Sequence, residues 1–252
     1  GWYNTQKAVM RGEASAEAIT ACWQKLGNIQ PQMLNFLENH DEQRLASPFF
    51  AGDARLGIAG MTVSAMMNIN PVMIYCGQEL GEPGMDEEGF SGRDGRTTIF
   101  DYWSIQCIRD WNNGGRFDKE KLSPAQVKLR ETYAKLLNIA KMEPVVSQGE
   151  FYDLMYANKD NPYMNVRKQY VFLRKWRNEV LLAVANFDRG DQSIGIRIPV
   201  EAFQTLGIED NKPAYVTDLF TGKRSISTLS DAFYYQVKVP AYGGALLKFS
   251  FM

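Results

Sequence analysis

The feature that most constrains the fold of this chain is a change in its hydrophobic pattern near residue 150. From Phe151 on, apolar residues come in short runs of strand length, separated by turn signals such as Arg177-Asn178 and Gly243-Gly244. Before that point, strand-like runs alternate with helix-like runs. Regular short strands are typical of antiparallel sandwiches, and alternation is typical of α/β folds. The sequence therefore predicts an α/β domain over 1–148, followed by an all-β domain over 149–252.

The individual elements follow from the spacing of apolar residues and from the residues that break helices and strands. In the second domain we expect a Greek-key antiparallel β-sandwich, with strands at Gln169–Trp176, Glu179–Phe187, Ser193–Pro199, Ala214–Phe220, Tyr234–Val239 and Ala245–Phe251. In the first domain we expect helices at Ser15–Leu26, Asp53–Met67 and Pro124–Met142, with strands at Met33–Leu37 and Pro71–Cys76. Ser15 and Ser123 are the expected caps of their helices.

The two strands of the first domain are too few to complete a fold. The continuous apolar run Pro71–Cys76 predicts a strand buried on both faces, with Cys76 as a buried thiol. Two parallel strands cannot close a barrel. We therefore expect the first domain to be the tail of a larger βα-repeat domain, and its unpaired edges to permit self-association.

Charge and cysteine content exclude several classes of partner. The 28 basic and 29 acidic side chains give a net charge of −1, which offers no reason to expect nucleic acid or an anionic membrane as partner. No apolar run is long enough to span a membrane. The three cysteines lack the spacing of a zinc site or a disulfide framework.

The stretch LNFLENHDEQR, at 34–44, is the best candidate for chemistry. It places His40, the only histidine, and Asp41 directly after a predicted strand. Catalytic groups of parallel α/β folds lie on such loops. An imidazole can donate to a hydroxyl group and a carboxylate can stabilise a developing cation, and both suit sugar chemistry. The alternative is an ordinary polar loop with a solvated histidine.

A second strand, PVMIY, ends in the polar stretch CGQELGEP. Its glycines would allow a tight exit from the strand, and Glu79 could either serve the site or pair with a neighbouring arginine as part of the structure. The acids that follow, Asp86, Glu87 and Glu88, are expected to form a solvated loop without a role. No GxSxG nucleophile elbow is present, which argues against a serine-type triad.

Together these motifs resemble the alpha-amylase family, glycoside hydrolase family 13. FLENHDEQR resembles the NHD segment at the seventh barrel strand, and NPVMIYCGQELG resembles the eighth strand and its exit. The helix at 124–142 is similar to the last barrel helix, and the strands after 151 to the C-terminal β domain. The resemblance implies the C-terminal fragment of a (β/α)8 TIM barrel, followed by an antiparallel β-sandwich.

The resemblance also implies roles for individual residues. Asp41 would be the carboxylate that stabilises the transition state without attacking the sugar. His40 would bind sugar hydroxyls in the subsite where cleavage occurs. Asn39 and Arg44 would contribute to substrate binding, chiefly by holding the loop, and Glu79 would be mainly structural. The ligand would be an alpha-glucan or an oligosaccharide.

The retaining mechanism of that family also needs a nucleophile and a general acid about 5 Å apart. The family carries them in a GxRxD-like stretch and a later Glu segment, and we expect neither in this chain. The parent enzyme would then be a hydrolase and this chain inactive alone. We expect no cofactor here, with calcium confined to upstream regions, and the compartment stays open.

Two alternatives remain open at this stage. One is a noncatalytic relative that binds carbohydrate or a partner protein. Its candidate surface would be an aromatic platform on the β domain, formed by Tyr152, Tyr156, Trp176, Tyr234 and Tyr235. The other is a transglycosylase or isomerase of the same family.

Overall fold

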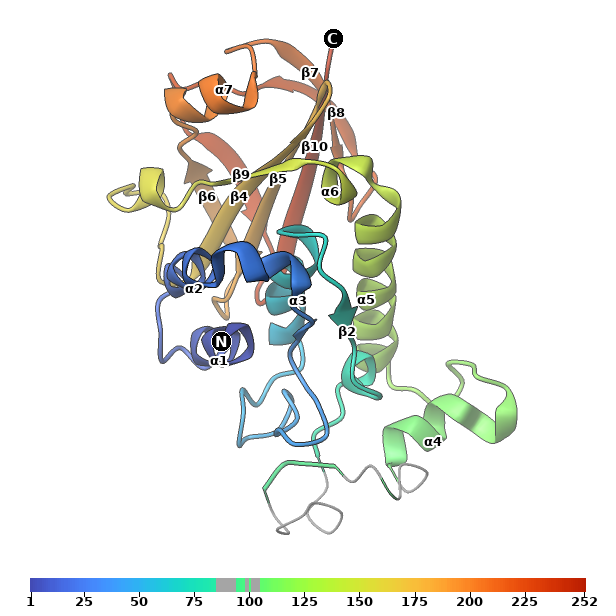
Figure 1. Ribbon diagram of the computed structural model, residues 1–252. Coiled ribbons are helices and arrows are strands. Elements are labelled where there is room, and N and C mark those ends of the chain that lie inside the picture. Colours follow the sequence, from blue (N-terminus) through green and yellow to red (C-terminus); the bar gives the residue numbers. More distant parts are fainter. Residues whose placement is uncertain (85–93, 98–99, 101–104) are drawn as a thin grey trace.

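The computed structural model describes residues 1–84, 94–97, 100 and 105–252, so the acids Asp86, Glu87 and Glu88 lie outside the described residues. We keep the names first and second domain for residues 1–148 and 149–252. Figure 1 shows the helices of the first beneath and beside a sheet formed by the second. The first domain contains α1 (Trp2–Met10), α2 (Ala18–Leu26), β1 (Asn35–Phe36), α3 (Leu56–Met66), β2 (Val72–Met73), α4 (Gln106–Asn112), α5 (Pro124–Met142) and α6 (Pro144–Ser147). Short 3₁₀ turns lie at Gly27–Gln32, Gln78–Leu80 and Asn113–Gly115.

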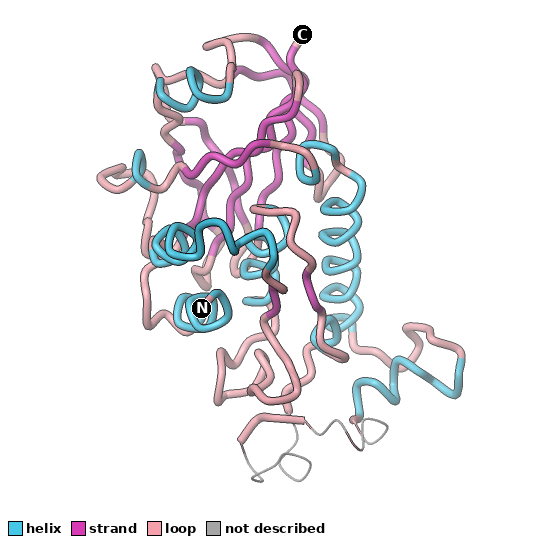
Figure 2. Tube along the Cα trace, viewed as in Figure 1, coloured by secondary structure: helices cyan, strands magenta, loops and turns pink. Residues whose placement is uncertain are grey.

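The second domain is built around one antiparallel sheet. Its elements are β3 (Glu150–Asp153), β4 (Gln169–Trp176), β5 (Glu179–Asn186), β6 (Gln192–Ile196), α7 (Val200–Leu206), β7 (Pro213–Asp218), β8 (Arg224–Thr228), β9 (Tyr235–Val239) and β10 (Gly244–Phe251). Six strands pair in the order β3-β4-β5-β10-β7-β8, and β6 pairs with β9 in a separate ladder. Figure 2 shows these strands gathered in one region. The predicted antiparallel β region is confirmed, while the Greek-key sandwich stays a prediction.

The two strands of the first domain pair in parallel, as the strand–helix–strand order predicts. Asn35 pairs with Val72 and Phe36 with Met73. Two expectations about the second strand are wrong, because β2 is only half-buried and Cys76 is exposed. Within the described residues β1 is the only strand that pairs with β2, so one edge of β2 is left uncovered.

The helices differ from expectation mainly at their starts. The second helix begins at Ala18 and not at Ser15, because the Ser15 hydroxyl caps no helix. It accepts a hydrogen bond from the Glu17 N–H and donates one to the Val166 carbonyl, which ties α2 to the β region. By contrast, α5 begins as predicted, with a capping box between Ser123 and Gln126.

One apolar core runs through both domains. Helix α3 lies at its centre, and ten of its eleven residues are buried. Its small residues permit close packing: a Cβ atom added to Gly60 would lie 3.0 Å from Leu37 and 3.1 Å from the Met10 sulfur. Glycine at this helical position therefore serves the approach of α3 to β1 and α1. Among the described residues, no helix is long and apolar enough to cross a membrane.

Candidate functional site

The two motifs singled out in the sequence meet at one edge of the parallel pair. Because β1 and β2 run in the same direction, their carboxyl ends lie side by side, and the loops that follow begin there. The loop after β1 contains Glu38–Arg44, and the loop after β2 contains Cys76. The Arg44 guanidinium joins them, since its Nη2 donates to the Cys76 carbonyl at 2.7 Å. The two loops are thus joined by a direct contact.

A buried ion pair forms the base of this site. Arg44 Nη1 donates to Glu38 Oε2 at 2.8 Å, and both side chains are almost completely buried, at 1% and 2% exposure. The other carboxylate oxygen accepts the Leu45 N–H at 2.6 Å, and Arg44 Nε donates to the Thr97 hydroxyl at 3.0 Å. The guanidinium also lies 4.2 Å from the centre of the Tyr75 ring. Its donors are thereby engaged by three separate segments of chain.

The buried Glu38 carboxylate needs the Arg44 guanidinium as its partner. Burial raises the pKa of the Glu38 carboxyl above its ordinary value, while Arg44 and the Leu45 N–H act in the opposite direction. A buried carboxylate without that guanidinium would be strongly disfavoured. The fully buried position of Arg44 suits the loop-holding role and leaves no face for direct contact with a sugar.

His40 and Asp41 project from the loop into solvent. Their side chains are 50% and 70% exposed, and His40 Nε2 lies 3.3 Å from Asp41 Oδ2. The backbone beneath them is fixed: Asn39 Oδ1 accepts the Asp41 N–H at 2.8 Å, and Arg96 Nε donates to the Asp41 carbonyl at 2.7 Å. The pair is therefore carried by an ordered turn, with both functional groups accessible.

Helix α1 anchors the other side of the loop. The Tyr3 hydroxyl donates to Glu42 Oε2 at 2.9 Å, and Lys7 Nζ donates to Gln43 Oε1 at 3.1 Å. Tyr3 also stacks on Phe36 of β1, with ring centres 5.3 Å apart. Burial raises the pKa of Tyr3, so its hydroxyl stays a donor at neutral pH.

Sequence reasoning did not assign three of these supporting residues: Glu38, Tyr3 and Arg96. Glu38 directly follows an apolar run, but glutamate is rarely fully buried, so its burial could not be predicted from the sequence. Tyr3 and Arg96 show no local signal either. Their contacts depend on how α1 and the 94–97 segment fold against the loop.

Glu79 lies near the site but makes no ion pair with an arginine among the residues that the structure describes. The pairing of an acid with a neighbouring arginine is made by Glu38 and Arg44 instead. Glu79 is half-buried and lines a groove between β2 and α5, together with Arg130. The preceding Gly77 has φ of 93°, which supports the prediction that glycine permits a tight strand exit.

One expectation about motifs needs correction. The residues Gly114-Gly115-Arg116-Phe117-Asp118 do match the letters GxRxD. They follow the NHD stretch instead of preceding it. Their first two residues end a 3₁₀ turn, with Gly114 at φ of 69°, and none of the five lies in a strand. Asp118 lies 3.3 Å from the Arg116 guanidinium in an exposed ion pair. This match therefore lacks the strand context that the nucleophile of the family requires.

The aromatic residues proposed as a sugar-binding platform on the β domain make separate ring contacts. Tyr152 packs with Tyr156, and their hydroxyls are 2.7 Å apart. Tyr234 meets Tyr163 edge to face, whereas Tyr235 packs on Phe249. In the part of the chain that the structure describes, no ring contact links the first pair to the others, so these residues do not form one stacked cluster.

Comparison with known proteins places the fold. No protein-family model and no curated protein sequence matches the chain. Solved structures do match over the whole chain. A noncanonic maltogenic alpha-amylase, AmyB from Thermotoga neapolitana, has a TM-score of 0.65 at 15% identity, with 100% of this chain and 50% of that chain covered.

Two further solved structures agree. The alpha-amylase of Geobacillus thermoleovorans, complexed with acarbose, has a TM-score of 0.63 at 15% identity and covers 98% of this chain and 46% of its own. An Anoxybacillus alpha-amylase has a TM-score of 0.63 at 16% identity, with 100% of this chain and 46% of that chain covered. This chain thus spans about half the length of the structures it matches, and it has the fold of the C-terminal region of alpha-amylases.

Proposed function

We propose that this chain is the C-terminal portion of an alpha-amylase-like glycoside hydrolase acting on alpha-glucans by a retaining mechanism. The observation that carries the proposal is the meeting of the NHD loop and the loop after β2 at one edge of a parallel strand pair, in a chain with this fold. The alpha-amylase that matches in complex with acarbose supports an oligosaccharide as the ligand.

Asp41 would stabilise positive charge on the sugar ring, and His40 would donate to a sugar hydroxyl. The accessible carboxylate of Asp41 can face a developing oxocarbenium ion without forming a bond to it. The contact between His40 Nε2 and Asp41 Oδ2 orients the imidazole beside that carboxylate. Asn39 and Arg44 would hold the turn, and Glu79 would support the neighbouring loop.

The chain alone would not hydrolyse glucans, because cleavage with retention needs two further carboxyl groups about 5 Å apart. The test incubates the purified chain with starch and with an aryl maltoside, and measures reducing ends and released phenol. We expect no turnover by the chain or by its Asp41→Ala variant. Turnover by the chain that disappears in the variant would refute the claim that the nucleophile is absent.

A noncatalytic carbohydrate-binding role is the alternative. It is favoured by the exposure of His40 and Asp41, which makes the pair available for binding without turnover. Affinity electrophoresis in starch gels separates two versions of this role. Retardation lost in Asp41→Ala assigns binding to the strand-end loop, whereas retardation lost only in Trp176→Ala assigns it to the β domain.

A further inference from the structure

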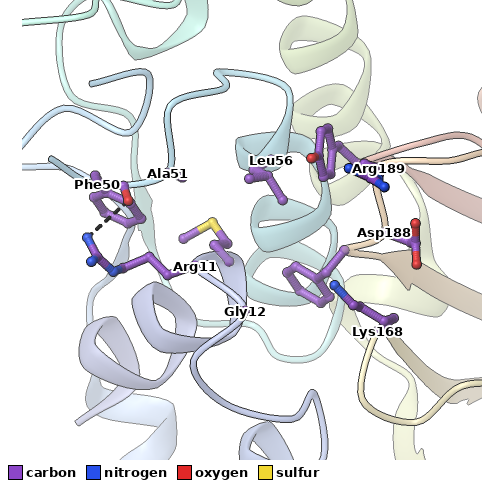
Figure 3. A pocket seen from close by; sticks show the side chains of 11 residues that line it. Arg11, Gly12, Phe50, Ala51, Leu56, Lys168, Asp188 and Arg189 are labelled. Atoms are coloured by element: carbon purple, nitrogen blue, oxygen red, sulfur yellow. Dashed lines mark hydrogen bonds between the residues drawn. The ribbon is translucent and has the colours of Figure 1, made fainter. Parts of the chain in front are cut away.

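A second candidate site lies where the two domains meet, away from His40 and Asp41. A pocket of about 500 Å³ opens between the end of α1, the segment around Phe50 and three loops of the β domain. Figure 3 shows its lining residues. From the first domain come Met10, Arg11, Gly12, Phe50, Ala51 and Leu56, and from the second come Lys168, Phe187, Asp188, Arg189 and Tyr242. The pocket size is typical of small-molecule sites.

Some of the cationic side chains in and near this pocket pair with a carboxylate, and others do not. Arg11 is neutralised by Glu13 at 2.6 Å, and its guanidinium turns to the Phe49 and Phe50 carbonyls. The nearby Arg55 is neutralised by Asp53 at 2.6 Å. Lys168 and Arg189, by contrast, make no ion pair with any described residue.

Asp188 is the one carboxylate in the lining. It accepts the Gly190 N–H at 3.0 Å, and in Figure 3 it turns outward while the Lys168 amine lies toward the middle of the lining residues. The Asp188 carboxylate therefore does not pair with the Lys168 amine, which stays available to a ligand. The pocket keeps a net positive charge in a protein whose total charge is −1.

The backbone at Lys168 is held by hydrogen bonds. The Lys168 N–H donates to the Asn165 carbonyl at 2.8 Å, and the Lys168 carbonyl accepts the Phe187 N–H at 2.8 Å. The Asp188 carbonyl in turn accepts the Tyr242 N–H at 2.9 Å. The loops that carry Lys168 and Arg189 are thus cross-linked, so both side chains extend from ordered backbone beside a common cavity.

We propose that this pocket binds a small phosphate-bearing ligand, with the phosphate at Lys168 and Arg189. Charge-assisted bonds from these two side chains would replace the missing ion pairs. The apolar side chains of Met10, Leu56 and Phe187 would contact the remainder of the ligand, such as the sugar of a phosphate ester. Because the lining comes from both domains, the ligand would also hold them together.

Titration of the full chain with glucose 6-phosphate, inorganic phosphate and glucose, followed by calorimetry at low ionic strength, tests the proposal. We expect glucose 6-phosphate and phosphate to bind and glucose not to bind. Tighter binding of the ester identifies a phosphorylated sugar, and equal binding identifies free phosphate, and both support the site. Lys168→Met should weaken binding of glucose 6-phosphate by about tenfold or more, as expected for loss of a charge-assisted bond.

Lys175→Met is the matched control, because it removes the same charge near the other end of β4, about 23 Å away at 3.3 Å per residue. It should leave the affinity unchanged. Arg189→Gln changes an exposed residue, so it tests the site even if Lys168→Met fails to fold. The proposal is overturned if glucose binds as tightly as its phosphate ester, or if Arg189→Gln and Lys168→Met bind like the unaltered chain.

Discussion

The six-stranded antiparallel sheet and the parallel β1–β2 pair of this protein are stabilised in different ways. In the β domain, β4 and β5 pair over eight residues, and their apolar side chains are almost all fully buried. In the first domain, β1 and β2 pair over only two residues, and β2 is half-buried. The large sheet therefore depends on backbone pairing and apolar burial, whereas the small one depends on side-chain contacts around Arg44. The candidate site thus lies at the end of the parallel pair, which has fewer backbone pairs and less apolar burial than the six-stranded sheet.

The same contrast appears in two buried arginines. Arg44 has a carboxylate partner, Glu38. Arg174 on β4 is 3% exposed, and within the described residues it has no carboxylate partner. It donates instead to backbone carbonyls at the ends of α3 and α6, including those of Met66 at 3.0 Å and Val146 at 2.6 Å. Burial lowers the pKa of Arg174 to about 10. Carbonyl groups at helix ends can thus replace a counter-ion.

Removal of Arg44 should have the largest effect. Arg44→Met leaves the Glu38 carboxylate buried without a partner, which costs about 3–5 kcal/mol. Urea unfolding of the variant measures this loss. The double variant Arg44→Met with Glu38→Gln should recover part of it, because it also removes the stranded charge. A double variant as unstable as the sum of the two single variants would show that the pair is not coupled.

Removal of Arg174 should cost less, about 1–3 kcal/mol, because the orphaned carbonyls carry only partial charge. The same urea titration on Arg174→Met measures it. Hydrogen exchange should show faster exchange at the C-terminal end of α3 and little change in the centre of β5. If Arg174→Met proved more destabilising than Arg44→Met, the proposed ranking of the two arginines would be wrong.

A smaller effect is expected at the start of α5. Ser123→Ala removes the hydroxyl that accepts the Gln126 N–H, and loss of such a cap costs about 1 kcal/mol. Thermal unfolding measures the change. Ser15→Ala is the contrasting variant, since Ser15 caps no helix, and its loss would affect the contact with Val166 and not the helicity of α2.

The last prediction needs no substitution, because it compares the rates at which two cysteines react with an alkylating reagent. Cys76 is exposed at the open side of β2, whereas Cys107 is buried with its sulfur 2.8 Å from Glu82 Oε2. Burial raises the pKa of both thiols, and that of Cys107 more strongly. Alkylation monitored by mass spectrometry should therefore modify Cys76 faster as pH rises, while Cys107 stays unmodified in the folded chain. Protection of Cys76 at high protein concentration would indicate self-association over this edge.

The comparison of the sheets also explains what the sequence could predict. The strands β4 and β5 were predicted almost to the residue, because their apolar runs are long and the turn between them is clear. The strand β8 was missed, since its Arg224–Thr228 segment is polar and largely exposed at the sheet edge. The burial of Cys76 was predicted wrongly for a related reason. An apolar run indicates that a strand can be covered, but not that a neighbour is present to cover it.

Within the candidate site, the sequence pointed to the loop residues His40, Asp41, Asn39 and Arg44, but not to the more distant residues that hold the loop in place. His40 and Asp41 stand out by residue type and by their place after a strand. The supporting contacts of Tyr3, Arg96 and Thr97 join segments that are distant in the chain, so no local sequence pattern predicts them. The complete burial of Arg44 could not be read from the sequence either.

The most direct test of the proposed sugar site uses the single histidine as a reporter. Because His40 is the only histidine, its imidazole gives one set of NMR signals without assignment by mutation. Titration with maltotriose should shift these signals in a saturable way, and Asp41→Ala should weaken the response. Glycerol at equal hydroxyl concentration is the control for nonspecific effects. If maltotriose leaves the His40 signals unmoved while shifting signals elsewhere, the strand-end loop is not the sugar site, and the central claim is contradicted.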